Sequence, residues 1–129
     1  MNRGLTPEEL KHIIILKGGD DPDNQIILGC LVALPISEKT MYLSRMKIGK
    51  PFRKNKLASE LLAHALHDAK DRKFSFAFAV TLSEKAARLL QKFNAEEINR
   101  YDFFKEIPQS IAQRNCPCSE NHRYWRIRI

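Results

Sequence analysis

The fold is decided by the stretch Met41–Asp71, which reads MYLSRMKIGKPFRKNKLASELLAHALHDAKD. In its first part, Met41–Ile48, apolar and polar side chains interleave without an internal glycine or proline, which is typical of a strand. From Leu57 onward, the apolar residues recur at the spacing of one helix face. This stripe comprises Leu57, Ala58, Leu61, Leu62, Ala65, Leu66 and Ala69. The stretch therefore predicts a strand, a connecting loop and a helix.

The region around the connecting loop is strongly basic. From Arg45 to Lys56 the sequence contains no acid and six cations, which are Arg45, Lys47, Lys50, Arg53, Lys54 and Lys56. A helix N-terminus presents unpaired backbone N–H groups and the positive end of the helix dipole. Together these features favour a bound phosphate at the loop. The alternative interpretation is a solvated basic face, a nuclear-address patch or a nonspecific anion site.

The same loop resembles the acetyl-coenzyme A loop of the GNAT superfamily of N-acetyltransferases. That loop usually follows an aliphatic strand end and reads Arg-x-x-Gly-x-Gly/Ala, with a Leu-Leu pair on the helix. Within Ile48–Ala58, Arg53 matches the arginine and Ala58 matches the last small residue. Leu61-Leu62 follows as the helix pair. Lys56 stands at the place of the central glycine, whose missing side chain lets the backbone approach a pyrophosphate closely.

The segments after this helix extend the resemblance to about Ile26–Lys105. Phe74–Thr81 is apolar nearly throughout, as a strand buried on both faces should be. Ser83–Phe93 predicts a second helix with its serine as the N-cap. This helix resembles the family pattern Ser…Ala-Arg-x-Leu-Tyr-x-Lys-Leu-Gly-Phe. Leu90 stands at the place of the tyrosine, which is the catalytic acid in many family members.

The N-terminal part departs from the family. His12–Lys17 and Gln25–Pro35 predict an antiparallel hairpin, in which Gly29 marks either a bulge or tight packing. Only eleven residues precede this hairpin, enough for one short helix over Leu5–Lys11. A GNAT domain usually has a strand and two helices there, and those helices wall the amine-acceptor pocket. We therefore expect most of the acceptor-side helices to be missing.

Two further strands are expected toward the C-terminus. The resemblance to the family implies one over Glu96–Lys105, and alternating apolar and basic side chains predict the other over His122–Ile129. In the family, the last strand commonly inserts beside the centre of the sheet. The run Tyr101–Phe104 and the long connection after it resemble the arylalkylamine-type branch of the superfamily.

The resemblance implies a single α/β domain over residues 1–129, with a central mixed, mostly antiparallel sheet flanked by helices. It implies acetyl-coenzyme A as the cosubstrate and a small primary amine of unspecified identity as the acceptor. Backbone N–H groups of Lys54–Ala58 would bind the pyrophosphate, and Arg53 and Lys54 would add charge. The edge of Met46–Ile48 would bond to the pantetheine arm. The expected cofactor-binding residues are Met46, Ile48, Arg53, Lys54, Asn55, Lys56, Leu57 and Ala58.

The sequence assigns no catalytic residue. An amine acetyl transfer needs a base for the incoming amine and an acid for the departing thiolate, and Leu90 cannot transfer a proton. Leu89 and Gln91 beside it are no better, while a water or Tyr101 is an open substitute. A degenerate relative that keeps the fold without catalysis is therefore an alternative. A homodimer mate that completes the acceptor site is another.

Net charge and side-chain clusters leave two further hypotheses. The formal net charge of +7 attracts polyanions in general. A nucleic-acid-binding module would use the terminal aromatic and basic residues Tyr124, Trp125, Arg126 and Arg128, although such a strand more often closes a sheet. Two clusters invite a metal, His64 with His67 and Cys116 with Cys118 and His122. Neither has the full ligand pattern of a zinc site, so no metal is expected.

The cysteine content and the hydropathy of the sequence indicate the cellular compartment of the protein. Three cysteines make no disulfide framework, and Cys30 is expected in the core. No apolar run is long enough to span a membrane, and the first residues lack the apolar segment of a signal peptide. The sequence therefore predicts a cytoplasmic protein without a membrane partner.

Overall fold

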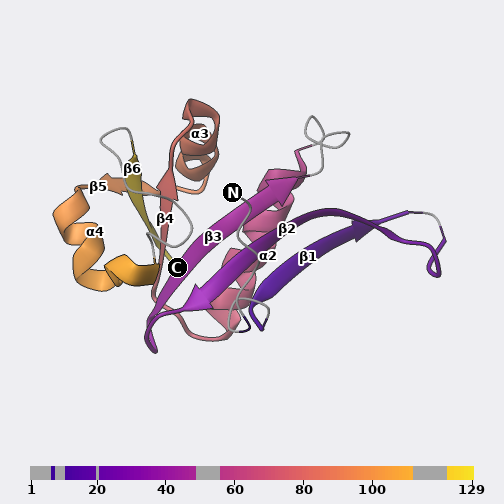
Figure 1. Cartoon of the computed structure of the whole chain (residues 1–129), viewed down its shortest axis with the longest axis horizontal. Coiled ribbons are helices and arrows are strands. Elements are labelled where there is room, and N and C mark those ends of the chain that lie inside the picture. The colour runs from indigo at the N-terminus through magenta and orange to yellow at the C-terminus, as the bar shows by residue number, and fades with distance from the viewer. Residues whose placement is uncertain (1–6, 8–10, 20, 49–55, 112–121) are drawn as a thin grey trace.

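The computed structural model describes residues 7, 11–19, 21–48, 56–111 and 122–129 of the chain. Its centre is a six-stranded sheet with the strand order β1-β2-β3-β4-β6-β5 (Figure 1). The strands are β1 (Ile13–Gly18), β2 (Ile26–Pro35), β3 (Thr40–Ile48), β4 (Phe76–Thr81), β5 (Glu96–Ile98) and β6 (Arg123–Arg128). Neighbouring strands are antiparallel except β3 and β4, which are parallel. The mixed, mostly antiparallel sheet expected from the sequence is confirmed.

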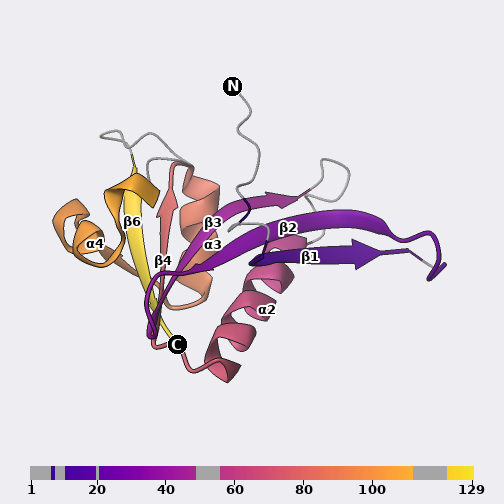
Figure 2. The ribbon, with the colours of Figure 1, turned by 60° about the horizontal axis from the view of Figure 1, so that its bottom comes forward.

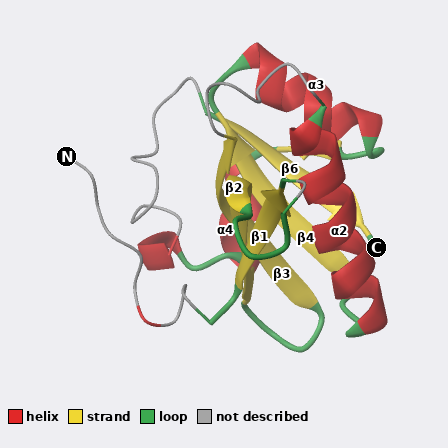
Figure 3. Ribbon diagram, turned by 90° about the vertical axis from the view of Figure 1, so that its right-hand side faces the viewer, coloured by secondary structure: helices red, strands yellow, loops and turns green. Residues whose placement is uncertain are grey.

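Helices flank both faces of this sheet. They are α2 (Leu57–Asp71), α3 (Glu84–Lys92) and α4 (Arg100–Glu106). Figure 3 shows α2 and α3 on one side of the strands and α4 on the other. Because β3 and β4 are parallel neighbours, the chain must cross over between them, and α2 makes this crossover. The predicted order of strand, helix and strand is confirmed, while the basic loop between the first two, residues 49–55, lies outside the described residues.

Two apolar clusters fix the helices on the sheet. Under α2 and α3, the first cluster is built from the predicted helix stripe, with Leu61, Leu62, Ala65 and Ala69 fully buried. Under α4, the second cluster is largely aromatic. The Phe103 ring lies at its centre, with its centroid 4.9 Å from that of Tyr124. Strand β4 contributes to both clusters, so its expected burial on two faces is also confirmed.

The β1–β2 hairpin projects away from the helices (Figure 2). Its register changes where Leu16 pairs with Gly29 and Lys17 pairs with Ile27, which leaves Leu28 as an extra residue on β2. This is the bulge that Gly29 indicated. Beyond the bulge, Ile26 and Ile27 are 52% and 60% exposed. The hairpin therefore contributes to the core only through its half nearer the body.

The expected strand over Glu96–Lys105 is wrong beyond Ile98, because a helix follows. Asn99 caps this helix by accepting the Asp102 backbone N–H at 2.7 Å. Phe103 and Ile107 are both fully buried, and their spacing of four residues suits one face of a helix rather than an alternating strand. The predicted terminal strand is confirmed as β6, which inserts between β4 and β5.

Three other expectations have different outcomes. Cys30 is only half-buried on β2, so its placement in the core is wrong. Most of Leu5–Lys11, the expected short helix, lies outside the described residues. No helix in the described part of the chain is long and apolar enough to cross a membrane.

Candidate functional site

Strands β3 and β4 separate toward their carboxyl ends and form a fork (Figure 1). They pair from Thr40 with Phe76 as far as Leu43 with Ala79. Past this vertex both strands continue, but β4 stays paired with β6 on its other side as far as Thr81. The edge of β3 that faces β4 has no neighbouring strand past Leu43 in the described part of the chain. Such an edge offers main-chain hydrogen bonds to an extended ligand.

A bulge in β3 lies just beyond the vertex. Ser44 pairs with Val32 on β2 and Lys47 pairs with Cys30, so two residues of β3, Arg45 and Met46, lie opposite one residue of β2. An extra residue bends the strand that carries it and increases its twist. The bulge therefore accounts for the departure of β3 from β4 at this point.

Helix α2 begins near the far end of β3, at the mouth of the fork (Figure 2). Its N-cap residue, Lys56, has φ 58° and ψ 21°, which is the left-handed conformation, and makes no side-chain cap hydrogen bond. Glycine adopts this conformation freely, whereas other residues pay roughly 1–2 kcal/mol. Lys56 thus has the backbone conformation to which the glycine of the family motif is suited.

The described members of the predicted cofactor-binding set lie around this mouth. Met46 and Ile48 are on β3, half-buried, and pack against the first apolar cluster. Lys56 is exposed, and Leu57 and Ala58 form the half-buried first turn of α2. The remaining three, Arg53, Lys54 and Asn55, lie outside the described residues. The assignment of all eight as binding residues stays a prediction.

The second helix fits the family pattern in its caps. Ser83 accepts the Ala86 backbone N–H at 3.1 Å, so its predicted role as an N-cap is confirmed. Asn94, at the place of the family's glycine, has φ 62°. Leu90 is 5% exposed and packs in the first cluster. Tyr101, the other open candidate for an acid, is 72% exposed on α4, where the Lys105 Nζ lies 4.5 Å from its ring centroid.

Sequence reasoning missed Ser44, the first residue of β3 past the vertex. It is 7% exposed, and its hydroxyl has no hydrogen-bond partner among the described residues. A hydroxyl that directly follows the apolar run Met41–Leu43 was the available signal. Its lack of a partner depends on long-range packing, which the sequence pattern does not contain.

An ion-pair cluster ties the C-terminal strands together. Arg123 on β6 donates from Nε and Nη2 to the two carboxylate oxygens of Glu97 at 3.0 and 2.9 Å. Its Nη1 also reaches Glu84 of α3 at 3.3 Å. Hydrogen bonding from Arg123, with a smaller contribution from its charge, holds the pKa of Glu97 below the ordinary value. On the same strand, Arg126 pairs with Glu96.

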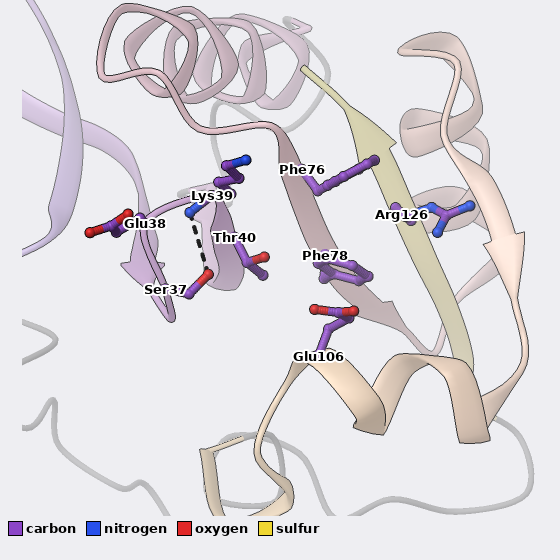
Figure 4. A pocket seen from close by; sticks show the side chains of 8 residues that line it. All are labelled: Ser37, Glu38, Lys39, Thr40, Phe76, Phe78, Glu106 and Arg126. Carbon is purple, nitrogen blue, oxygen red and sulfur yellow. Dashed lines mark hydrogen bonds between the residues drawn. The ribbon is translucent and has the colours of Figure 1, made fainter.

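A separate hollow of about 490 Å³ lies where β3 and β4 begin, at the end opposite the fork (Figure 4). Its lining is Ser37, Glu38, Lys39, Thr40, Phe76, Phe78, Glu106 and Arg126. In Figure 4, Glu106 of α4 faces the turn that carries Ser37 and Lys39 across the opening. Both signs of charge occur on its walls. The hollow thus lacks the basic character that a phosphate group needs.

The other candidate residues have different outcomes. Trp125 and Tyr124 are 1% and 5% exposed, and the Trp125 indole N–H donates to the Thr81 hydroxyl at 2.8 Å, so neither ring is open to stack on a base. His67 lies 3.5 Å from Asp71 on the exposed side of α2, where His64 is also exposed. Cys116 and Cys118 lie outside the described residues, so the zinc hypothesis for them is untested.

Comparison with solved structures shows a shared fold. An acetyltransferase from Streptococcus agalactiae has a TM-score of 0.65 and 16% identity, over 80% of this chain and 60% of its own. N-acetylglutamate synthase from Neisseria gonorrhoeae was solved with coenzyme A and N-acetyl-glutamate. It has a TM-score of 0.70 and 13% identity, over 93% of this chain and 26% of its own. A GNAT family acetyltransferase from Elizabethkingia anophelis, with acetyl-CoA bound, has a TM-score of 0.64 and 18% identity, over 92% of this chain and 99% of its own.

This chain thus spans 60% of the length of the Streptococcus agalactiae protein and about a quarter of the Neisseria gonorrhoeae synthase. Among curated proteins, no sequence matches it. Residues 4–95, most of the chain, match the family model described as the acetyltransferase (GNAT) family. That match covers the hairpin, the fork, α2 and α3, so the chain belongs to the GNAT acetyltransferase family.

Proposed function

We propose that the protein transfers an acetyl group from acetyl-coenzyme A to a primary amine. The observation that carries this proposal is the fork between β3 and β4, with the N-terminus of α2 at its mouth. Family membership supports it, and the related proteins from Elizabethkingia anophelis and Neisseria gonorrhoeae are solved with acetyl-CoA and coenzyme A.

The described residues fit coenzyme A at two places. At the mouth, the first-turn N–H groups of α2 and the exposed Lys56 favour the negative charge of a pyrophosphate. Along the fork, the edge of β3 suits an extended chain that alternates amide groups, because it can pair with that chain as a strand would. The expected binding residues Met46, Ile48, Leu57 and Ala58 lie on these two surfaces.

Acetyl-coenzyme A supplies an acyl group that is activated as a thioester. In the reaction, the amine nitrogen forms a bond to the carbonyl carbon, the carbon–sulfur bond breaks, and the nitrogen loses a proton while the thiolate gains one. The chain's contribution is to hold the thioester in the fork and to orient it. Leu90 provides no acid at the place of the family's tyrosine, so we expect the rate to depend mainly on this positioning.

A titration of the protein with acetyl-coenzyme A, followed by thermal unfolding, tests cofactor binding. We expect saturating acetyl-coenzyme A to raise the melting temperature, since a ligand that binds only the folded state stabilises it. Arg53→Glu should weaken binding by about 1–3 kcal/mol through lost charge-assisted hydrogen bonds and added repulsion. Lys85→Glu is the matched control, because it makes the same charge reversal on α3, outside the predicted binding set.

An unchanged melting temperature would refute cofactor binding. Equal stabilisation by acetyl-coenzyme A and by heparin would instead favour a general polyanion site. Consumption of acetyl-coenzyme A should then be measured against arylalkylamines, polyamines and lysine analogues. We propose the arylalkylamines as the first class to test, because of the resemblance of Tyr101–Phe104 to that branch.

A further inference from the structure

Ser44 places an unused hydroxyl at the vertex of the fork. It follows the last β3–β4 pair, Leu43 with Ala79, directly along the chain. Its side chain is 7% exposed, and its Oγ has no hydrogen-bond partner among the described residues. Buried hydroxyls are nearly always paired, because an unpaired one loses its bonds to water without replacement. An orphan hydroxyl at this position therefore calls for a partner beyond the described residues, and a ligand that lies in the fork can supply one.

The surroundings of Ser44 make that hydroxyl a strong donor. Its cross-strand neighbour on β2 is Val32, which is 0% exposed, and Tyr42 on the same face of β3 is 2% exposed. In such a dry, apolar environment a hydrogen bond is stronger than in water. A donor that is held in place before the ligand arrives also needs no reorganisation when charge develops next to it.

The direction of the fork selects the part of the ligand that meets Ser44. Phosphates belong at the mouth, beside the start of α2, so a chain running along β3 from Ile48 toward Ser44 moves away from them. Four residues of strand cover about 13 Å. The group that reaches the vertex is therefore the far end of the pantetheine arm, where the thioester lies.

We propose that the Ser44 hydroxyl donates a hydrogen bond to the thioester carbonyl oxygen of a bound acyl-coenzyme A. This inference rests on the proposed function and adds a residue to it. Because free coenzyme A has no carbonyl at that place, Ser44 gives the site a preference for the acylated form. The same bond strengthens as negative charge develops on the oxygen during attack by the amine.

The test compares acetyl-coenzyme A with coenzyme A as ligands of the wild type and of Ser44→Ala, by calorimetry and by thermal unfolding. We expect the variant to bind coenzyme A as the wild type does but to lose about two- to tenfold of the preference for acetyl-coenzyme A. Without ligand, Ser44→Ala should melt a few degrees higher, since it removes an unpaired buried hydroxyl. Ser44→Thr keeps a hydroxyl and should restore the preference.

Thr81→Val is the matched control. It removes a hydroxyl that is equally buried but has a partner, because the Trp125 Nε1–H donates to it at 2.8 Å. We expect this variant to melt lower than the wild type, with its preference for acetyl-coenzyme A unchanged. Once an acceptor amine is known, Ser44→Ala should also reduce kcat by about 10²-fold, as the loss of one such donor does.

The outcomes separate this inference from the proposed function. If neither ligand binds to the wild type, the proposed function fails. If both bind and Ser44→Ala keeps the full preference for acetyl-coenzyme A, the function stands and the role of Ser44 is overturned. A lower melting temperature of Ser44→Ala without ligand would also overturn it, since that result means that the hydroxyl already has a partner in the protein. A change confined to the KM of the amine would assign Ser44 to the acceptor and overturn the assignment to the thioester.

Discussion

Lys56 has a left-handed backbone conformation at the start of α2. Its replacement by glycine tests two hypotheses: that this conformation is strained, and that the start of α2 binds the phosphates of acetyl-coenzyme A. The residue has φ 58° and ψ 21°, is exposed, and makes no side-chain cap hydrogen bond. Lys56→Gly therefore removes a strained side chain without breaking a described cap contact. It also restores the glycine that the family motif has at this place.

The expected gain in stability follows from two opposing terms. Relief of the left-handed strain contributes about 1–2 kcal/mol. Against it, glycine increases the conformational freedom of the unfolded chain, which costs about 0.4–1 kcal/mol. The net increase in the free energy of unfolding should be about 0.5–1 kcal/mol. For a chain of this length that corresponds to a rise of roughly 2–4 °C in the melting temperature.

The expected effect on binding separates the backbone from the charge. Lys56→Gly removes the Cβ next to the first-turn N–H groups and so lets a phosphate approach them more closely. It also removes a cation, and the lost attraction to the phosphate costs about 0.2–1 kcal/mol, as for an exposed ion pair. Lys56→Ala loses the same cation but keeps the Cβ and the strain. We expect Lys56→Gly to bind acetyl-coenzyme A about three- to tenfold more tightly than Lys56→Ala, and more tightly than the wild type.

Lys73→Gly is the matched control for Lys56→Gly. Lys73 also has a left-handed conformation, with φ 68°, but lies just beyond the other end of α2. Both variants remove one lysine from a left-handed position, so their net charge is the same. Lys73→Gly should raise the melting temperature by a similar amount and leave the affinity unchanged. Thermal unfolding and calorimetry measure the two effects separately.

Two results would refute this reasoning. If Lys56→Gly binds no more tightly than Lys56→Ala, the Cβ does not limit the approach of the phosphate. If Lys56→Gly tightens the binding of acetyl-coenzyme A no more than Lys73→Gly does, the start of α2 does not bind the cofactor in the way proposed.

Two further variants test the second helix and the C-terminal strands. Leu90→Tyr should lower stability by about 1–3 kcal/mol because it overpacks the first cluster, yet it should raise turnover, since a positioned acid contributes about 10²–10⁴ in rate. Leu90→Phe is its control for size, and equal rates for the two variants would show that the acid does not act from this position. Glu97→Gln should lower the melting temperature at neutral pH by an amount equivalent to less than about 1 kcal/mol, because Arg123 loses its carboxylate partner. Since the folded pKa of Glu97 is lowered from the 4.5 of the free group, its stabilisation is present above that value and disappears as the pH falls through the folded pKa. A difference between the wild type and Glu97→Gln that persists at lower pH would contradict this account.

The parts of the fold that the sequence predicted are those set by local periodicity. The stripe from Leu57 to Ala69 has the period of a helix, and it lies between two strand patterns, so a parallel crossover was the consistent arrangement. The short α4 was missed because the strand that the family resemblance implies was extended through Asn99, although an asparagine before helically spaced aromatic residues is a cap signal. Here the burial of Phe103 against three strands decides the structure, and that burial depends on contacts distant in sequence.

The fork shows a different limit of prediction from sequence. A motif match identified Lys56 as a departure from the family, but the residue type says nothing of the backbone, which has the left-handed conformation that the missing glycine would favour. The same holds at Asn94, where asparagine replaces the other glycine of the family patterns and also has a positive φ. At both places a residue other than glycine holds the left-handed conformation, which costs more for lysine than for asparagine. A single position can therefore keep the left-handed conformation after its glycine is lost, so the backbone conformation describes such a position better than the residue type does.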